Sequence, residues 1–218
     1  MTQFVSLRFL TLPADRQADR DRIIEGLRAV IRELPGVQSA WIAPILPAPV
    51  IHAGQIVWRT IFATENDSLL APIAPVWREK IAPLIEGAQI TALGYRTTRM
   101  GVAKKGPGIW RALIFRTFTG ADQETVRELE SNLLLFPKYI STIKSWALSN
   151  VSTMDGPKGF THVWEQEFDS VEGLLGEYMD HPLHWGVVDS YFDAELPQYI
   201  VEGHVIQAVA EIDGSIMQ

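Results

Sequence analysis

The 218-residue sequence contains no cysteine. Without thiols the chain forms no disulfide, has no thiolate nucleophile and holds no zinc ribbon or iron–sulfur cluster. A chain that uses no cysteine is consistent with a reducing compartment. We therefore expect a cytoplasmic location.

Positive charge and long apolar runs are also scarce. The formal net charge is -7, and no basic run exceeds Lys104-Lys105. A nucleic-acid-binding surface needs clustered Lys and Arg, so nucleic acid is not an expected partner. No apolar run reaches the roughly 18 residues that span a bilayer. The N-terminus lacks the basic stretch and apolar core of a signal peptide. No membrane partner is expected either.

What the chain does contain is 47% hydrophobic residues, enough for a sizeable core, with seven tryptophans that could fill that core or line an aromatic pocket. Period-two and helical patterns, together with Pro and Gly breaks, predict the alternation of elements. Strands are expected at 4–12, 39–46, 55–63, 90–99, 109–118, 143–148, 160–168 and 199–209, and helical segments at 19–34, 69–84, 122–136, 170–178 and 182–192.

These elements fall into two halves with the same order, β-α-β-β-α-β, which is the ferredoxin-like arrangement. Residues 1–100 form the first half, 101–108 have linker composition, and 109–218 form the second half. Local matches between the halves, such as Trp58 with Trp164, favour a duplication. The predicted class is α+β.

Histidine is concentrated in the second half. His162 lies in an apolar strand, and His181 and His184 flank Pro182 at a helix break. Imidazole titrates near neutral pH, so such a group is suited to proton transfer. His181, directly before the proline, is expected to be structural.

The second half resembles the Dabb family of dimeric α+β barrel domains over about 109–210. The resemblance is carried by Gly159-Phe160-Thr161-His162, by the turn at 168–172 and by the motif at 178–184, followed by Asp189 and Tyr191. It implies that both halves are supplied by one chain and form an intrachain pseudo-dimeric barrel. Since Dabb domains usually pair, a homodimer of this chain is a further possibility.

The resemblance extends to plant polyketide cyclases of this family and implies a site. His184 would act as acid and base, oriented by Glu202 of the last strand, with His162 and Tyr178 at the substrate. Arg111 stands where that pattern has a histidine. A permanent cation there suits a substrate carboxylate or an enolate oxygen.

Each of these residues also has a structural reading. His184 could cap a helix, His162 could be a satisfied core histidine, and Tyr178 could be a half-buried aromatic residue. Arg111 needs an anion, because a buried guanidinium does not lose its charge. That anion is either bound substrate or one of Glu165, Glu167 and Glu202.

Further residues are expected around the substrate. Trp164 and Trp185 would supply apolar walls. His204 follows Glu202 by two residues, so its side chain is expected on the same face of that strand. His162, His184 and Glu202 could form a two-histidine, one-carboxylate metal triad. However, no compact metal motif or nucleotide-binding loop is present, so neither metal nor another cofactor is expected.

The sequence therefore predicts a cofactor-independent lyase or cyclase that acts on a small hydrophobic aromatic or polyketide-like molecule. Decarboxylation of an aromatic acid is expected on an equal footing with ring closure. One alternative is a non-catalytic stress-responsive or ligand-binding Dabb protein. The other is a cofactor-free monooxygenase or isomerase.

Overall fold

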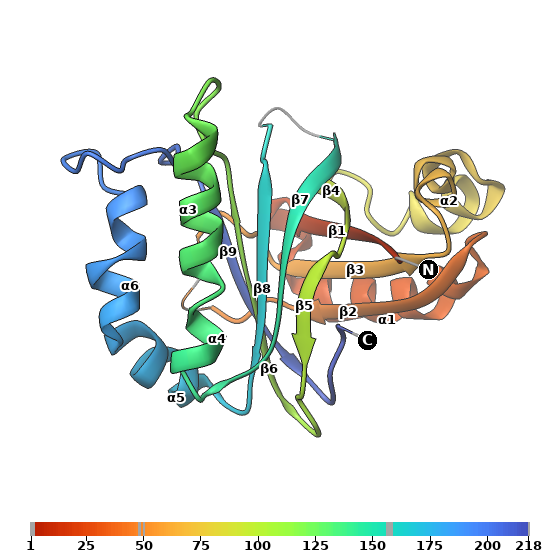
Figure 1. Cartoon of the computed structure of the whole chain (residues 1–218). Helices are drawn as coiled ribbons and strands as arrows, with labels where there is room; N and C mark the ends of the chain where they lie inside the picture. Colours follow the sequence, from red (N-terminus) through yellow and green to blue (C-terminus); the bar gives the residue numbers. More distant parts are fainter. Residues whose placement is uncertain (1–2, 48, 50, 156–158, 218) are drawn as a thin grey trace.

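A computed structural model of the chain describes residues 3–47, 49, 51–155 and 159–217. The elements alternate as the hydrophobic pattern predicts (Figure 1). The strands are β1 Phe4–Thr11, β2 Val37–Pro44, β3 Ile56–Phe62, β4 Gln89–Arg96, β5 Arg99–Val102, β6 Gly108–Phe115, β7 Ile143–Asp155, β8 His162–Phe168 and β9 Ile206–Ile212. The α-helices are α1 Arg20–Val30, α2 Glu65–Leu70, α3 Gln123–Leu133, α4 Phe136–Tyr139, α5 Val171–Gly173 and α6 Pro182–Gly186.

Each half also contains one π-helical turn, at Trp77–Ile81 and at Leu174–Tyr178. Both turns lie in the segment after the third strand of their half. Prolines interrupt the regular helix in these segments, as the sequence predicts at Pro72, Pro75 and Pro182.

The strands pair in the order β2-β3-β1-β4 in the first half and β7-β8-β6-β9 in the second. Antiparallel pairing of β4 with β7 joins the two sheets. At the other end the Leu46 N–H donates to the Val209 carbonyl at 2.8 Å, which brings β2 and β9 together and closes a barrel. The predicted α+β barrel fold is confirmed. A duplication as its origin, and the division at 1–100 and 109–218, stay predictions.

The alternation of side chains along each strand creates two environments. In β8, Val163 and Glu165 belong to the barrel interior, whereas Trp164 and Phe168 pack on the other face under helices. Helices α1 and α2 cover the first half, and α3, α4 and α6 cover the second (Figure 1). A ligand site can therefore lie inside the barrel or between a sheet and its helices.

The barrel interior contains a buried ion pair between the two halves. Arg59 of β3 donates from Nε to Glu165 Oε1 of β8 at 2.9 Å. Trp110 Nε1 donates to the same oxygen at 3.0 Å, and the Tyr95 hydroxyl donates to Oε2 at 2.8 Å. Burial and the Glu165 charge raise the pKa of Tyr95, so the phenol keeps the proton that it donates.

Residues near the C-terminus close this interior. The Ile216 carbonyl accepts from Arg59 Nη1 at 2.7 Å, and the Ile216 N–H donates to Glu167 Oε1 at 2.8 Å. Met217 is buried in the same core. These bonds engage both oxygens of Glu165 and one oxygen of Glu167, and among the described residues neither carboxylate forms the ion pair that was considered for Arg111.

Several element boundaries differ from the sequence prediction. Strand β7 extends to Asp155 because its second part pairs with β4, and its polar sequence gave no period-two signal. The segment 101–108, predicted as a linker, begins within β5, which pairs with β7, and ends in β6. Most of the turn predicted at 156–159 lies outside the described residues.

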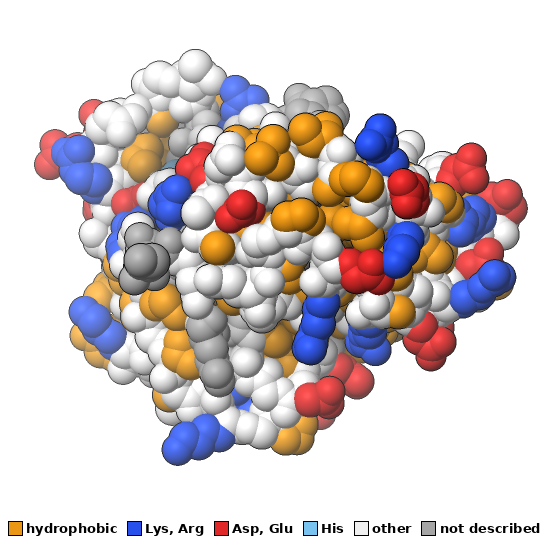
Figure 2. All heavy atoms as spheres, turned by 90° about the vertical axis from the view of Figure 1, so that its right-hand side faces the viewer, with side chains coloured by type: hydrophobic (Ala, Val, Ile, Leu, Met, Phe, Trp, Pro, Cys, Tyr) orange, Lys and Arg blue, Asp and Glu red, His pale blue; other side chains and the backbone are white. Residues whose placement is uncertain are grey.

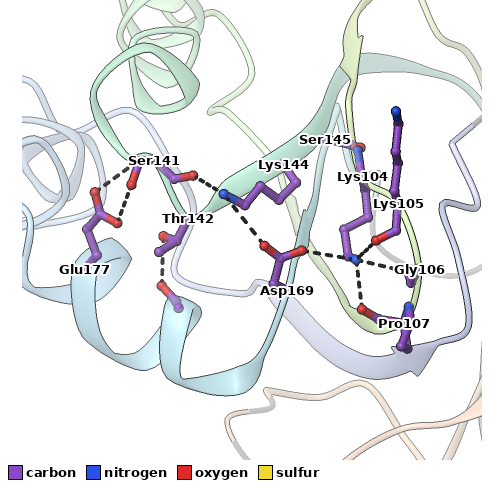
Figure 3. A network of polar contacts seen from close by, with 11 residues as sticks. Lys104, Lys105, Gly106, Pro107, Ser141, Thr142, Lys144, Ser145, Asp169 and Glu177 are labelled. Carbon is purple, nitrogen blue, oxygen red and sulfur yellow. Dashed lines mark hydrogen bonds and ion pairs between the residues drawn. The ribbon is translucent and has the colours of Figure 1, made fainter.

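Lys104 anchors the connection between the halves (Figure 3). Its side chain is almost fully buried, and Nζ donates to the carbonyls of Lys105, Gly106 and Pro107 at 2.7, 2.9 and 2.8 Å. Nζ also lies 3.1 Å from Asp169 Oδ1 at the end of β8. A single ammonium group thus fixes the chain where it enters β6.

Replacement of Lys104 by methionine is expected to lower the free energy of unfolding by about 2 kcal/mol, because buried carbonyls lose a charged donor. Urea unfolding measures the effect. The control is Lys105→Met, which changes the exposed neighbouring lysine. Equal stability of the two variants would show that Lys104 is not an anchor.

Candidate functional site

The second half contains a buried cation between its sheet and its helices. Arg111 of β6 is 3% exposed. Its guanidinium donates to Gln166 Oε1 at 2.7 Å, to the Tyr178 hydroxyl at 3.1 Å and to Gln207 Oε1 at 2.6 Å. It also lies 5.2 Å from the centre of the Tyr178 ring. All of these partners are neutral, and no ion pair among the described residues includes Arg111.

Three buried N–H donors in this cluster have no hydrogen-bond acceptor within the part of the chain that the structure describes. They are Arg111 Nε, Trp164 Nε1 and Gln166 Nε2. Burial raises the pKa of Tyr178, against the opposing effects of the Arg111 charge and of the nearby Trp164 and Gln166 side chains. Buried donors without acceptors are rare in folded proteins and need an explanation. A bound oxygen acceptor, preferably an anion, would satisfy them.

His184 lies at the edge of the cluster. Its ring centre is 5.1 Å from that of Tyr178 and 6.1 Å from that of Phe136. Nδ1 lies 3.5 Å from Asp189 Oδ2. Burial lowers the pKa of His184, and the Arg111 charge adds to this, against the opposing effect of Asp189. The imidazole is therefore neutral at pH 7 and able to accept a proton.

The π-helical turn Leu174–Tyr178 positions the tyrosine, and polar contacts hold this turn against the chain before β7 (Figure 3). Glu177 accepts hydrogen bonds from the Ser141 N–H at 2.9 Å and from its hydroxyl at 3.1 Å. Thr142 donates to the Gly173 carbonyl at 3.1 Å. Because π-helical turns occur often at functional sites, the location of Tyr178 on one is consistent with a binding role.

His162 has its own partners away from Arg111. Nε2 lies 3.1 Å from Glu130 Oε1 of α3, Nδ1 lies 2.7 Å from the Thr161 hydroxyl, and the ring stacks on Phe115 with centres 4.7 Å apart. The bond to His162 is the main cause that lowers the pKa of Glu130. Both ring nitrogens are thus engaged, as in a satisfied core histidine. A catalytic role for His162 stays a prediction.

The structure gives His184 and Glu202 separate partners instead of the predicted pair. Glu202 lies before β9, where the chain makes only an isolated bridge from Val201 to Thr117, and its carboxylate is 3.2 Å from Arg116 Nε. The last strand begins at Ile206, after Gly203, and not at 199 as expected. The carboxylate beside His184 is that of Asp189.

Two residues predicted to contact the substrate lie outside the cluster. Trp185 is 62% exposed, and its Nε1 donates to the Asp180 carbonyl at 3.1 Å. His204 lies in the loop before β9, with its ring between those of His52 and Phe160 at 4.8 and 5.8 Å. Trp164, by contrast, lies within the cluster.

The sequence prediction missed Gln166, Gln207 and Asp189 as site residues. Gln166 follows Trp164 by two positions, so strand alternation alone places both on one face. Asp189 follows His184 by five residues within the same motif, and this spacing was the available signal. Gln207 required the pairing of β9 with β6, which only the fold supplies.

Among the described residues, no three or more His, Asp or Glu side chains gather so that they could hold a metal ion. The members of the considered triad have separate partners: Glu130 for His162, Asp189 for His184 and Arg116 for Glu202. In the described part of the chain, no helix combines the length and apolar character needed to cross a membrane.

The fold and the site define an α+β barrel protein whose buried polar cluster lies beneath the helices of one half. Residues 109–201 match the family model of the stress responsive A/B barrel domain, Dabb. Residues 109–201 are thus similar to Dabb domains, as the motifs predict. A search of curated proteins found no match.

Solved structures share the fold over nearly the whole chain. An anthrone oxidase-like protein matches with a TM-score of 0.70 at 8% identity, covering 97% of this chain and 91% of its own. A proposed monooxygenase from Lactobacillus acidophilus NCFM has a TM-score of 0.56 at 10% identity, with 100% of both chains covered. A mutant chlorite dismutase from Candidatus Nitrospira defluvii has a TM-score of 0.58 at 10% identity, covering 96% and 92%. At such identities these likenesses show the fold alone.

Proposed function

We propose that the protein is a cofactor-independent enzyme that removes a proton from a small aromatic or polyketide-like substrate. The observation that carries this proposal is the group of three buried donors without acceptors beside a buried, permanently charged guanidinium. Such an arrangement stabilises negative charge on a substrate oxygen, because fixed donors in a dry site need no reorganisation.

In this proposal His184 is the base. Its lowered pKa keeps the imidazole neutral, and Asp189 stabilises the imidazolium that forms when it takes the proton. The electron pair left on the substrate becomes an enolate or phenolate. Its oxygen is held by Arg111, Trp164 and Gln166, while the Tyr178 hydroxyl donates to it or to a neighbouring oxygen.

The substrate class follows from the surroundings. Aromatic side chains of Phe136, Trp164 and Tyr178 surround the polar groups, which suits a flat apolar molecule with one or two oxygens. His184 is the partly exposed member, and the apolar side chains of Leu175 and Trp185 are exposed on the adjacent turns. In this proposal the substrate enters beside His184.

A carbanion of this kind leads to more than one product. Attack on a carbonyl carbon closes a ring, which is the cyclase reaction expected from the sequence. In the lyase reaction, an aromatic acid held by Arg111 would lose carbon dioxide while the protonated His184 gives a proton to the ring carbon that the carboxylate leaves. Reaction of the same carbanion with dioxygen would give the oxidase or monooxygenase chemistry named for two of the similar structures. The proton removal is common to ring closure and to reaction with dioxygen.

The proposal is tested by deuterium exchange at the acidic carbon of anthrone and of aromatic β-keto acids, followed by NMR. His184→Ala is expected to slow the catalysed exchange by about 10²–10⁴-fold at an unchanged melting temperature. Because the pKa of His184 is lowered, the wild-type rate should remain level as pH falls through 6.5 and decline only below it.

His181→Ala is the matched control. His181 Nδ1 accepts from the Leu183 N–H at 3.1 Å and caps α6, so this variant should lose stability but keep the pH profile. Wild-type exchange no faster than in buffer, with the substrate still bound, would instead favour a non-catalytic ligand-binding protein.

A further inference from the structure

The chain between β2 and β3 of the first half leaves its own sheet and runs along β9 of the second half. The Leu46 N–H donates to the Val209 carbonyl at 2.8 Å, and Ile51 and Gln207 exchange two backbone hydrogen bonds of 2.9 Å each. We call the described residues of 46–52 the crossover segment. Strand β9 thus pairs with β6 along one edge and with the crossover segment along the other.

The crossover segment reaches the helix side of the second half. Leu46 is partly buried and packs against the core beneath the helices of that half. Its backbone partner Val209 belongs to the same core and lies opposite Arg111 in the register of β6 and β9. The first half therefore contributes an apolar side chain to the core that surrounds the proton-removal site.

The side chain of Gln207 links the crossover segment to Arg111. Its Nε2 donates to the Pro49 carbonyl at 3.3 Å, and its Oε1 accepts from Arg111 Nη2 at 2.6 Å. An amide serves both partners at once, because the carbonyl needs a donor and the guanidinium needs an acceptor. The two backbone bonds with Ile51 fix the point on β9 from which this side chain extends.

The crossover segment includes a strained residue that contacts on both sides hold in place. His52, directly after Ile51, has a φ of 51°, a left-handed conformation that is uncommon outside glycine. Its ring lies 4.8 Å from that of His204 in the loop before β9. Such a conformation persists only where the surrounding structure fixes it. The bonds to Gln207 and the stacked rings thus attach the segment to the second half in one conformation.

The first half also has an exposed apolar surface, around α2. Figure 2 views the side of the molecule on which α2 lies and shows hydrophobic side chains gathered there. Leu69 and Ile73 of this surface are 55% and 67% exposed. Leu46 and Pro49 of the crossover segment are partly buried instead. The contact of the first half with the second-half site is therefore separate from this exposed surface.

We infer that the crossover segment is a positioning element of the proton-removal site, in which Pro49 and Ile51 fix Gln207 and Gln207 fixes the Arg111 guanidinium. The inference rests on the proposed function. With Nη1 and Nη2 of Arg111 bound to oxygens of the protein, the guanidinium plane is fixed and Nε remains for a substrate oxygen. The first half thus takes part in the reaction, although the histidine motif lies in the second.

A comparison of Ile51→Pro with Ile51→Ala in the whole protein tests the inference. Proline lacks the N–H that donates to the Gln207 carbonyl, whereas alanine keeps both backbone bonds. The probe is the side-chain Nε–H signal of Arg111 in ¹H–¹⁵N NMR, identified by its absence in Arg111→Met. We expect this signal to shift in Ile51→Pro and to keep its wild-type position in Ile51→Ala. Deuterium exchange of anthrone should be slower by about tenfold or more in Ile51→Pro than in Ile51→Ala, because the guanidinium is misplaced.

Gln207→Glu gives a second readout. The new carboxylate pairs with Arg111 and no longer donates to Pro49, so catalysed exchange should fall by at least about tenfold. The charged groups that act on His184 are Asp189, which raises its pKa, and Arg111, which lowers it. Neutralisation of Arg111 should therefore move the acid limb of the exchange rate to higher pH. A merely structural role of Gln207 would lower the melting temperature and leave this limb in place.

The inference is overturned if the Arg111 signal of folded Ile51→Pro stays where it is in Ile51→Ala, or if the signal shifts while the exchange rate is kept. Wild-type protein that catalyses no exchange contradicts the proposed function, and an unshifted Arg111 signal in Ile51→Pro then overturns the positioning role separately. Should Ile51→Pro fail to fold, an acid limb of Gln207→Glu that stays at its wild-type pH overturns the inference.

Discussion

Replacement of Arg59 by methionine is expected to lower the free energy of unfolding by about 3–5 kcal/mol, because it leaves Glu165 as a buried charge without its cation. The carboxylate is fully buried, and its other partners, Tyr95 and Trp110, are neutral donors. Chemical unfolding at pH 7 measures the loss. Since the pair joins β3 to β8, we also expect the two halves to unfold together.

The double variant Arg59→Met with Glu165→Gln separates this charge effect from lost packing. It should recover at least about half of the stability that the single change removes, because neither charge of the pair remains. The exposed Arg127→Met serves as control. A single Arg59 variant within about 0.5 kcal/mol of wild type, the range of ordinary surface substitutions, would contradict a structural role for the pair.

Arg111→Met is expected to reduce catalysis and to leave stability nearly unchanged, in contrast to the destabilising Arg59→Met. Catalysed proton exchange should fall by about 10²–10³-fold, as for loss of a donor to a developing oxyanion. The free energy of unfolding should change by less than about 1 kcal/mol, because the lost hydrogen bonds to Gln166 and Gln207 are offset by removal of an uncompensated buried charge.

Exchange kinetics and urea unfolding are measured for Arg111→Met and for Arg59→Met, so that activity and stability can be compared. The two arginines are similarly buried, at 3% and 4% exposed, but only Arg59 has a carboxylate partner. A loss of 3 kcal/mol or more in Arg111→Met would show that this residue stabilises the fold, and it would remove the main support for an anion site.

The sequence predicted the order of elements well, because alternating apolar residues and Pro or Gly breaks mark most strands and helices of this chain. It failed for strands whose boundaries are set by tertiary contacts. The polar half of β7 pairs only because β4 of the other half lies beside it. Glu202 was assigned to the last strand, yet the chain at Gly203 does not pair, and β9 begins only at Ile206.

The site was predictable to a similar extent. Arg111 in an apolar strand and His184 in the motif before Asp189 carried chemical signals in the sequence. The partners of the buried arginines carried no such signal, because they lie on strands that are distant in the sequence. Arg59 and Glu165 are 106 residues apart in the sequence, and Arg111 and Gln207 are 96 apart. Only the closed barrel brings these side chains together.

The most direct test of the proton-removal site is a crystal structure with 1-hydroxy-2-naphthoate, whose carboxylate and phenol resemble the proposed oxyanion. We expect a ligand oxygen at about 3 Å from Arg111 Nε and from Trp164 Nε1, with the ring beside His184. A ligand found only elsewhere, with both nitrogens still lacking an acceptor at saturating concentration, would contradict the proposed site.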